Sequence, residues 1–301
     1  MLLLAMSATW IGFLGDLWWF FDLFAHFRLQ YLALCLVALA WFVWQRSGMG
    51  MVSAALGLVV NGVLVFGLPV ETARRPEIAP GFRLRVASIN VHTSNRNAEK
   101  VLDYINQAEA DVVLLLEVDE WWAKALSPLT ETYPHHLIES REDNFGVAFF
   151  ARQADARSRI EYFGTLGLPS IVADLSHQGK SIRFIGTHPI PPMTASNSAF
   201  HAAQLGEIAD FVRSSEVPVL VAGDFNATPW SSGMRKLLGG GLMSLPDARH
   251  VWSPSWMVRW PMAIAIDHVV AVAPLAILSR TVGSDIGSDH RPILVECGWA
   301  P

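Results

Sequence analysis

The stretch VPVLVAGDFNATPWS, Val217–Ser231, decides the fold. Its apolar run lies between a proline and a glycine, which predicts a strand buried on both faces. Asp224 and Asn226 follow directly after this run. Ligands of open α/β sheets bind beyond the carboxyl ends of strands, whereas Asp and Asn are also ordinary turn residues. The stretch alone leaves both alternatives open, and the other segments decide between them.

The same pattern, an apolar segment that stops at a polar residue, recurs along the chain. Strands are predicted over residues 83–90, 111–117, 145–150, 182–187, 266–272 and 292–297. Amphipathic helices are predicted over residues 96–108 and 198–212. Polar residues lie near one end of most of these strands. They are Asn90, Glu117, His188, Asp267 and the tripeptide Ser288-Asp289-His290. They are expected to cluster on one rim of a sheet sandwich.

The charge of the globular part disfavours nucleic acid as a substrate. From residue 81 onward the chain has 18 Lys and Arg against 23 Asp and Glu, a net charge of −5. It contains no Lys/Arg-rich run, whereas proteins that track phosphates on a nucleic acid usually present a basic face.

Residues 1–70 differ sharply in composition from the rest. Their only charged residues are Asp16, Asp22, Arg28 and Arg46. Three apolar segments, residues 2–24, 30–44 and 49–68, predict three transmembrane helices, because a span needs roughly 20 apolar residues. A cleaved signal peptide is the alternative for the first segment, but that segment lacks a basic start and two more segments follow it.

These segments predict a multi-pass protein of the cell membrane. Residues 1–70 are the transmembrane region, residues 71–80 a polar, proline-containing linker, and residues 81–301 the globular domain. The distribution of arginines favours a cytoplasmic domain by only two residues, so the side of the membrane stays open.

Residues 251–262, VWSPSWMVRWPM, form a tryptophan-rich stretch just before Asp267. One alternative is a lid packed over the sandwich core. The other is a loop beside the site that touches the bilayer surface, because tryptophan favours the membrane interface. In that case Trp256 and Arg259 are candidate substrate-binding residues, since arginine pairs well with phosphate.

Six motifs together resemble the endonuclease/exonuclease/phosphatase superfamily, and they occur in that superfamily's order. They are INVH at 89–92, LLLEV at 114–118, THP at 187–189, GDFNATP at 223–229, IDHV at 266–269 and SDHRPI at 288–293. With the apolar N-terminal region, the chain looks most like a membrane-tethered bacterial branch that includes a teicoplanin-resistance phosphatase. The resemblance implies a DNase I-like, four-layered α/β sandwich in which two mixed sheets pack together between helices. It also implies metal-dependent hydrolysis of phosphoesters.

The resemblance also implies a metal site. Glu117 would hold Mg²⁺ or Mn²⁺, with Asn90 beside it and Asp289 next to the metal. This set suits magnesium, which takes few carboxylates and otherwise keeps water ligands. Asn144 matches a position where relatives place a polar residue on the phosphate, and the role of His92 stays open.

The same resemblance implies the catalytic roles. Asp224 would orient or deprotonate the attacking water, Asn226 would contact the phosphoryl oxygens, and His188 would face the phosphate. His290 would pair with Asp267, an arrangement that fixes one tautomer and raises the pKa of the histidine.

Three functions follow as alternatives. The first is a membrane-anchored, metal-dependent phosphohydrolase that cleaves a phosphoester or pyrophosphate bond, with a lipid-linked substrate as one option. The second is a metal-dependent endo- or exonuclease. The third is a non-catalytic, membrane-tethered binding module, which the intact set of site residues argues against.

Overall fold

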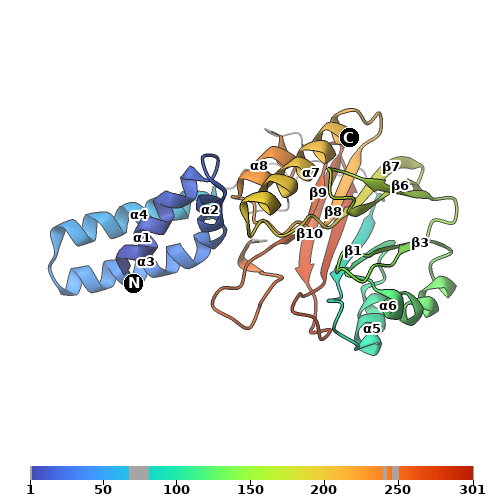
Figure 1. The fold of residues 1–301 in the computed structure, drawn as a ribbon, viewed down its shortest axis with the longest axis horizontal. Coiled ribbons are helices and arrows are strands. Elements are labelled where there is room, and N and C mark those ends of the chain that lie inside the picture. Colours follow the sequence, from blue (N-terminus) through green and yellow to red (C-terminus); the bar gives the residue numbers. More distant parts are fainter. Residues whose placement is uncertain (1, 68–80, 240–242, 246–250, 301) are drawn as a thin grey trace.

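The structure is a computed structural model that describes residues 2–67, 81–239, 243–245 and 251–300. The predicted linker, residues 71–80, lies outside the described residues. The described part of residues 81–300, called the sandwich domain below, contains two sheets that pack face to face (Figure 1). Residues 2–67, called the helical region, lie at one end of this domain (Figure 1).

Each sheet is mixed, with one parallel pair at its centre. The first has the order β10 (Leu275–Val282), β11 (Ile293–Trp299), β1 (Leu84–Asn90), β2 (Val112–Leu116), β4 (Val147–Ala151), β3 (His135–Glu139). The second has the order β5 (Arg157–Tyr162), β6 (Pro169–His177), β7 (Lys180–Thr187), β8 (Val219–Asp224), β9 (Asp267–Ala271). Only β1 with β2 and β7 with β8 pair in parallel.

Three apolar layers hold this sandwich together. The central layer lies between the sheets and includes Leu114, Phe149 and Phe184. The outer face of the first sheet is covered by α5 (Ala98–Ala108), α6 (Glu120–Ala125) and the short η3 (Ser127–Glu131). The outer face of the second is covered by α7 (Ala195–Arg213) and α8 (Ser232–Leu238). The chain is thus a four-layered α/β sandwich, as expected.

Strand direction brings the polar ends together. The parallel pairing of β1 with β2 places Asn90 beside Leu116, one residue before Glu117. The pairing of β7 with β8 places Thr187, and therefore His188, beside Gly223. Because β9 and β11 run antiparallel to β8 and β1, they begin at this same edge. We call this edge the rim, and every polar strand end predicted above reaches it.

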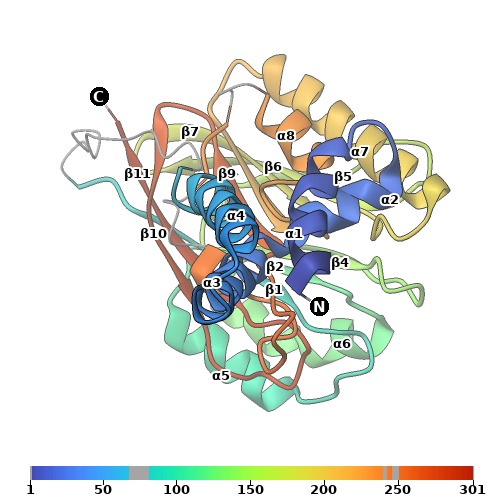
Figure 2. The ribbon, with the colours of Figure 1, turned by 90° about the vertical axis from the view of Figure 1, so that its left-hand side faces the viewer.

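In the helical region, α3 (Arg28–Trp44) and α4 (Gly48–Phe66) form an antiparallel hairpin that projects away from the sheets (Figures 1 and 2). Their close approach needs a small residue, since a Cβ on Gly57 would lie 2.6 Å from Cys35 Sγ. Many large apolar side chains of the hairpin face outward and are more than half exposed: Leu36, Val37, Val43, Trp44, Met49, Val52, Leu56, Val59, Val63 and Phe66. Among the described residues, Trp19–Trp44 and Gly48–Phe66 are long and apolar enough to cross a membrane.

The predicted first span, residues 2–24, is wrong as a single membrane-crossing helix. Helix α1 (Leu2–Ile11) ends early, and the chain continues through η1 (Gly12–Leu14), α2 (Trp19–Asp22) and η2 (Leu23–Phe27). The chain folds back on itself here and brings Gly15 close to Asp22. A Cβ on Gly15 would lie 2.4 Å from Asp22 Oδ1. This bend takes the Asp22 carboxylate to hydrogen-bond donors of Ser232 in α8. A carboxylate is costly in lipid, so partners in the sandwich domain favour the bend.

Candidate active site

Gly223 brings the two motif-bearing strands of the second sheet together at the rim. Its φ is +152°, and a Cβ there would lie 1.9 Å from the carbonyl oxygen of Thr187. Only glycine allows this approach, which places His188 next to Asp224. The backbone N–H of Asn226 then donates to Asp224 Oδ1 at 2.8 Å, and the Asn226 amide donates to the Pro189 carbonyl at 3.0 Å.

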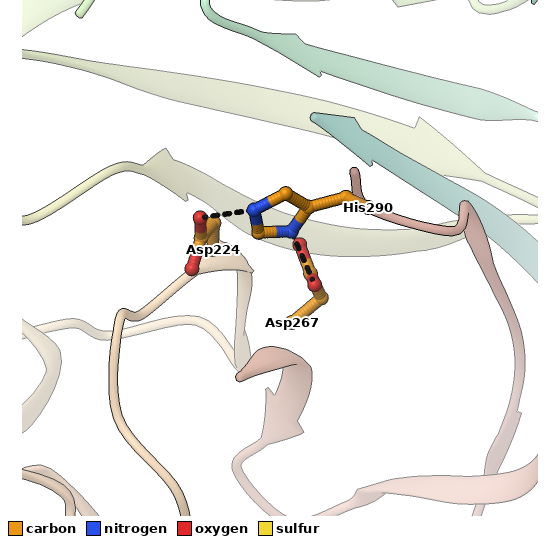
Figure 3. Close-up of side chains that lie close together, drawn as sticks. All are labelled: Asp224, Asp267 and His290. Carbon is orange, nitrogen blue, oxygen red and sulfur yellow. Dashed lines mark hydrogen bonds and ion pairs between the residues drawn. The ribbon is translucent and has the colours of Figure 1, made fainter. Parts of the chain in front are cut away.

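Asp224, His290 and Asp267 form a buried chain of polar contacts (Figure 3). His290 Nδ1 lies 2.9 Å from Asp267 Oδ2, and His290 Nε2 lies 3.6 Å from Asp224 Oδ2. The predicted pairing of His290 with Asp267 is therefore present. His188 approaches the same oxygen of Asp224, with Nε2 at 3.5 Å. Two imidazoles thus face one carboxylate.

The pKa values of Asp224, His290 and Asp267 distinguish an acid from a base among these three side chains. Burial lowers the pKa of His290, but the carboxylates of Asp267 and Asp224 outweigh burial and raise it to about 10. Burial raises the pKa of Asp267, yet the charge and hydrogen bond of His290 bring it below its usual value. Burial and Asp267 raise the pKa of Asp224, against the opposing effect of the two histidines. His290 is therefore protonated at neutral pH, and Asp224 is the more basic carboxylate.

Glu117 faces Asp224 from the other sheet. The Asn90 amide nitrogen donates to Glu117 Oε1 at 2.9 Å and to Asp224 Oδ2 at 3.2 Å. Glu117 Oε2 accepts from the backbone N–H of Thr93 at 3.1 Å. Asn90 therefore bridges the two carboxylates, and its own oxygen accepts from the backbone N–H of His92.

The rim also concentrates unusual backbone conformations. Eight described residues other than glycine have a positive φ, and five of them lie here: His92, Glu117, Asn144, Asn226 and Met257. Such conformations cost of order 1–3 kcal/mol each and are retained where the surroundings enforce them, often at functional sites. Their concentration at one rim supports a built site.

The remaining predicted residues lie around this centre. Asp289 Oδ2 accepts from Trp256 Nε1 at 3.1 Å, and Asp289 Oδ1 lies 3.9 Å from His92 Nδ1. Arg259 pairs with Asp285. Asn144 is exposed in the turn before β4, next to Phe145, whose ring packs on His188 with centroids 5.1 Å apart. The structure thus places all of them at the rim or beside it.

The helical region supplies contacts that the sequence did not indicate. Thr228, two residues after Asn226, donates its backbone N–H to His26 Nδ1 at 3.2 Å, and its Oγ1 lies 3.1 Å from the same nitrogen. Trp230 Nε1 donates to the carbonyl of Leu64 at 3.0 Å. No local pattern links positions 26 and 228, which are 202 residues apart. The segment that carries Asp224 and Asn226 is therefore held by the helical region.

The donor set fits a divalent cation. Glu117, Asp224 and Asp267 converge on the space between the sheets, and Asp289 lies at its edge. Carboxylate oxygens are the preferred ligands of Mg²⁺, and a cation would offset this excess of negative charge. Asp224, Asp267 and His290 also lie close enough to one another to share a metal. Both ring nitrogens of His290 already face a carboxylate. Each oxygen of Glu117 accepts one hydrogen bond and Asp289 Oδ2 accepts one from Trp256, which leaves lone pairs on both carboxylates for a cation.

Comparisons with known proteins agree with this geometry. The sequence matches the Endonuclease/Exonuclease/phosphatase family over residues 87–290. TDP2 of D. rerio, solved in complex with a single-strand DNA product, is 16% identical, with a TM-score of 0.59 over 72% of this chain and 99% of that one. The human Nocturnin catalytic domain with bound sulfate is 16% identical, with a TM-score of 0.59 over 72% and 94%.

A bacterial structure gives the same result. The endonuclease/exonuclease/phosphatase of Beutenbergia cavernae is 18% identical, with a TM-score of 0.60 over 72% of both chains. At these identities the structures share the fold. A comparison with curated proteins found no match. The family match covers most of the chain and includes the rim residues from Asn90 to His290, so the chain belongs to the endonuclease/exonuclease/phosphatase family of metal-dependent phosphoester hydrolases.

Proposed function

We propose that the chain is a membrane-anchored hydrolase that uses Mg²⁺ or Mn²⁺ to cleave a phosphoester or pyrophosphate bond of a lipid-linked substrate. The observation that carries this proposal is a contact between the helical region and residues 226–230, the segment that follows Asp224. His26 and Leu64 bind Thr228 and Trp230, directly after Asn226. The rim therefore stands at the base of the apolar hairpin.

The hairpin itself supports membrane anchoring. Only 22% of each candidate span is buried within the protein, whereas the core helix of a soluble domain is mostly buried. Exposed surfaces this apolar are rare on soluble monomers and mark interaction with a membrane or a protein. A small apolar cluster joins the helical region to the sandwich domain: Ala25, Val65, Trp230 and Val251.

In the proposed mechanism, Asp224 orients the attacking water and accepts its proton. Its raised pKa, caused first by burial, makes it a better base than an exposed carboxylate. The Asp267 and Asp224 carboxylates face the two ring nitrogens of His290 and raise its pKa to about 10, so the ring is held as a cation beside Asp224. His188 faces the same oxygen of Asp224, and its Nδ1 has no hydrogen-bond partner among the described residues.

The metal would be held by Glu117 and Asp289, with Asn90 beside them. A bound divalent ion neutralises charge on the phosphoryl oxygens and lowers the pKa of water. Asn90 orients the Glu117 and Asp224 carboxylates through its two donated hydrogen bonds. Asn226, whose amide now binds the Pro189 carbonyl, would turn this donor to the phosphate when substrate binds.

The test is a substrate panel on the purified full-length protein in lipid nanodiscs, with Mg²⁺ and with EDTA. The panel contains a phospholipid diester, a polyprenyl diphosphate, and single-stranded and plasmid DNA. We expect metal-dependent hydrolysis of a lipid substrate and its loss in Asp224→Asn. Faster hydrolysis of DNA would assign the nuclease function instead, and no hydrolysis of any substrate would favour the binding module.

Anchoring is tested separately. After mild lysis and a high-salt wash, the full-length chain should remain with the membrane fraction and be released by detergent. Recovery of the washed protein in the soluble fraction would contradict the proposed anchor.

A further inference from the structure

A cavity of about 590 Å³ opens beside the proposed active site. It lies between residues 256–260 and residues 285–291, and His92, Asp289 and Trp256 line it on the side of the catalytic centre. Trp256 connects the two sites, because its Nε1 donates to Asp289 and its backbone bridges to His290. A ligand bound at the metal residues would therefore reach into this cavity.

The cavity is cationic within an acidic domain. Lys100, Arg259 and Arg291 line it, against Asp285 and Asp289. Both arginines pair with the same oxygen of Asp285, with Arg291 Nη2 at 3.2 Å. One carboxylate thus positions two guanidinium groups and offsets only one of their two charges, and Asp289 belongs to the proposed metal site. A local excess of positive charge in a domain of net charge −5 indicates an anionic ligand.

The tryptophan-rich stretch, residues 251–262, lies next to the base of the hairpin, where α3 begins. Gln30, in the first turn of α3, donates its side-chain N–H to the Ala263 carbonyl at 2.7 Å. On this loop Trp260 is 64% exposed and Met262 is 48% exposed. If the hairpin lies in the bilayer, these side chains lie at its surface, where tryptophan is favoured. A lipid chain attached to a ligand in the cavity would extend out of the cavity across Trp260 and Met262.

We propose that this cavity binds a second anionic group of the substrate, next to the phosphate that is cleaved. The substrate class is an amphiphile with two neighbouring anionic groups, such as a lipid diphosphate. Arg259 and Arg291 hold the second group, because a guanidinium binds phosphate through paired hydrogen bonds. The proposal rests on the proposed function for the identity of the first phosphate.

Two short-chain probes test the second-anion site directly. They are an alkyl phosphonate and the alkyl methylenediphosphonate of the same chain length, titrated by calorimetry into the full-length protein in nanodiscs. Both titrations contain the same saturating Mg²⁺, so the site of the first phosphate is in the same state with each probe, and the arginine variants separate the cavity from chelation of a bound ion. We expect the diphosphonate to bind about tenfold or more tightly, the ratio expected from a charged hydrogen bond.

The variants assign that preference to the cavity. Arg259→Gln, and independently Arg291→Gln, should reduce the preference severalfold without changing binding of the monophosphonate. Arg213→Gln is the matched control, since Arg213 also pairs with an aspartate but on α7, and it should change neither affinity. Arg259 is 79% exposed, so its replacement does not threaten folding if Arg291→Gln proves unstable.

Equal binding of the two probes, or a preference that survives in Arg259→Gln, would overturn the inference. Either result leaves the proposed function intact if a plain lipid diester is hydrolysed with Mg²⁺. Conversely, a calorimetric preference that depends on the arginines would stand even if the hydrolysis panel failed.

Discussion

The contact between Asp22 and α8 predicts that the helical region and the sandwich domain are stabilised as one unit. The backbone N–H of Ser232 donates to Asp22 Oδ1 at 2.9 Å, and Ser232 Oγ donates to Asp22 Oδ2 at 2.9 Å. Asp22 is buried, with 7% of its surface exposed. Asp22→Ala therefore removes a buried carboxylate and leaves two donors without their partner.

The expected magnitude follows from these contacts. Hydrogen bonds to a charged group contribute about 1.5–3 kcal/mol. We expect Asp22→Ala to lower the free energy of unfolding by about 2–3 kcal/mol, within that range. For a protein of this size each kcal/mol corresponds to about 2–4 °C, so the melting temperature should fall by roughly 4–12 °C.

Asp16→Ala is the matched control. Asp16 contacts the same helix through Arg235 at 2.8 Å, but the two side chains are 64% and 45% exposed. Exposed ion pairs contribute about 0–1 kcal/mol, so this variant should melt close to the wild type. Thermal denaturation of the three full-length proteins in nanodiscs makes the comparison. Equal melting temperatures for Asp22→Ala and Asp16→Ala would refute the reasoning.

Three further predictions concern the metal and a buried ion pair. Glu117→Gln should raise the Mg²⁺ concentration for half-maximal hydrolysis by about tenfold or more, because it removes a charged oxygen ligand. The exposed Glu120→Gln is the control and should leave this concentration unchanged. Equal Mg²⁺ titration curves for the two variants would contradict Glu117 as a ligand. EDTA should abolish hydrolysis and added Mg²⁺ or Mn²⁺ restore it, and activity in excess EDTA would exclude the metal. Burial raises the pKa of Asp119, but its bonds to Arg96 and Trp122 hold the pKa below its usual value. Asp119→Ala should therefore cost about 1–2 kcal/mol at neutral pH. Denaturant titrations should show this difference begin to shrink below about pH 4, where the unfolded chain protonates, and vanish as pH falls through the lowered pKa of the native carboxylate. A difference independent of pH would contradict the pairing.

Much of the fold was predictable because the relevant signals are local. The strands that carry the rim residues, such as β2 and β8, are buried on both faces and appear in the sequence as continuous apolar runs. The strands that were missed include the largely buried β6 and edge strands with weaker patterns. In β5 charged residues alternate on an exposed edge, and β10 is only partly buried. Edge strands are specified by pairing with a neighbour, which no short window contains.

The motifs of the sequence by themselves determined the family, the sandwich and the set of rim residues, because parallel and antiparallel pairing forces strand ends with polar residues to one edge. Only the tertiary structure decided how these residues act on each other. Asn90 bridges carboxylates of two sheets, and Arg259 and Arg291 share Asp285 beside the active site. It also broke the predicted first span and placed His26 against Thr228, 202 residues away. Such contacts depend on packing between distant segments, and hydropathy along the chain carries no information about which buried partner a polar side chain will meet.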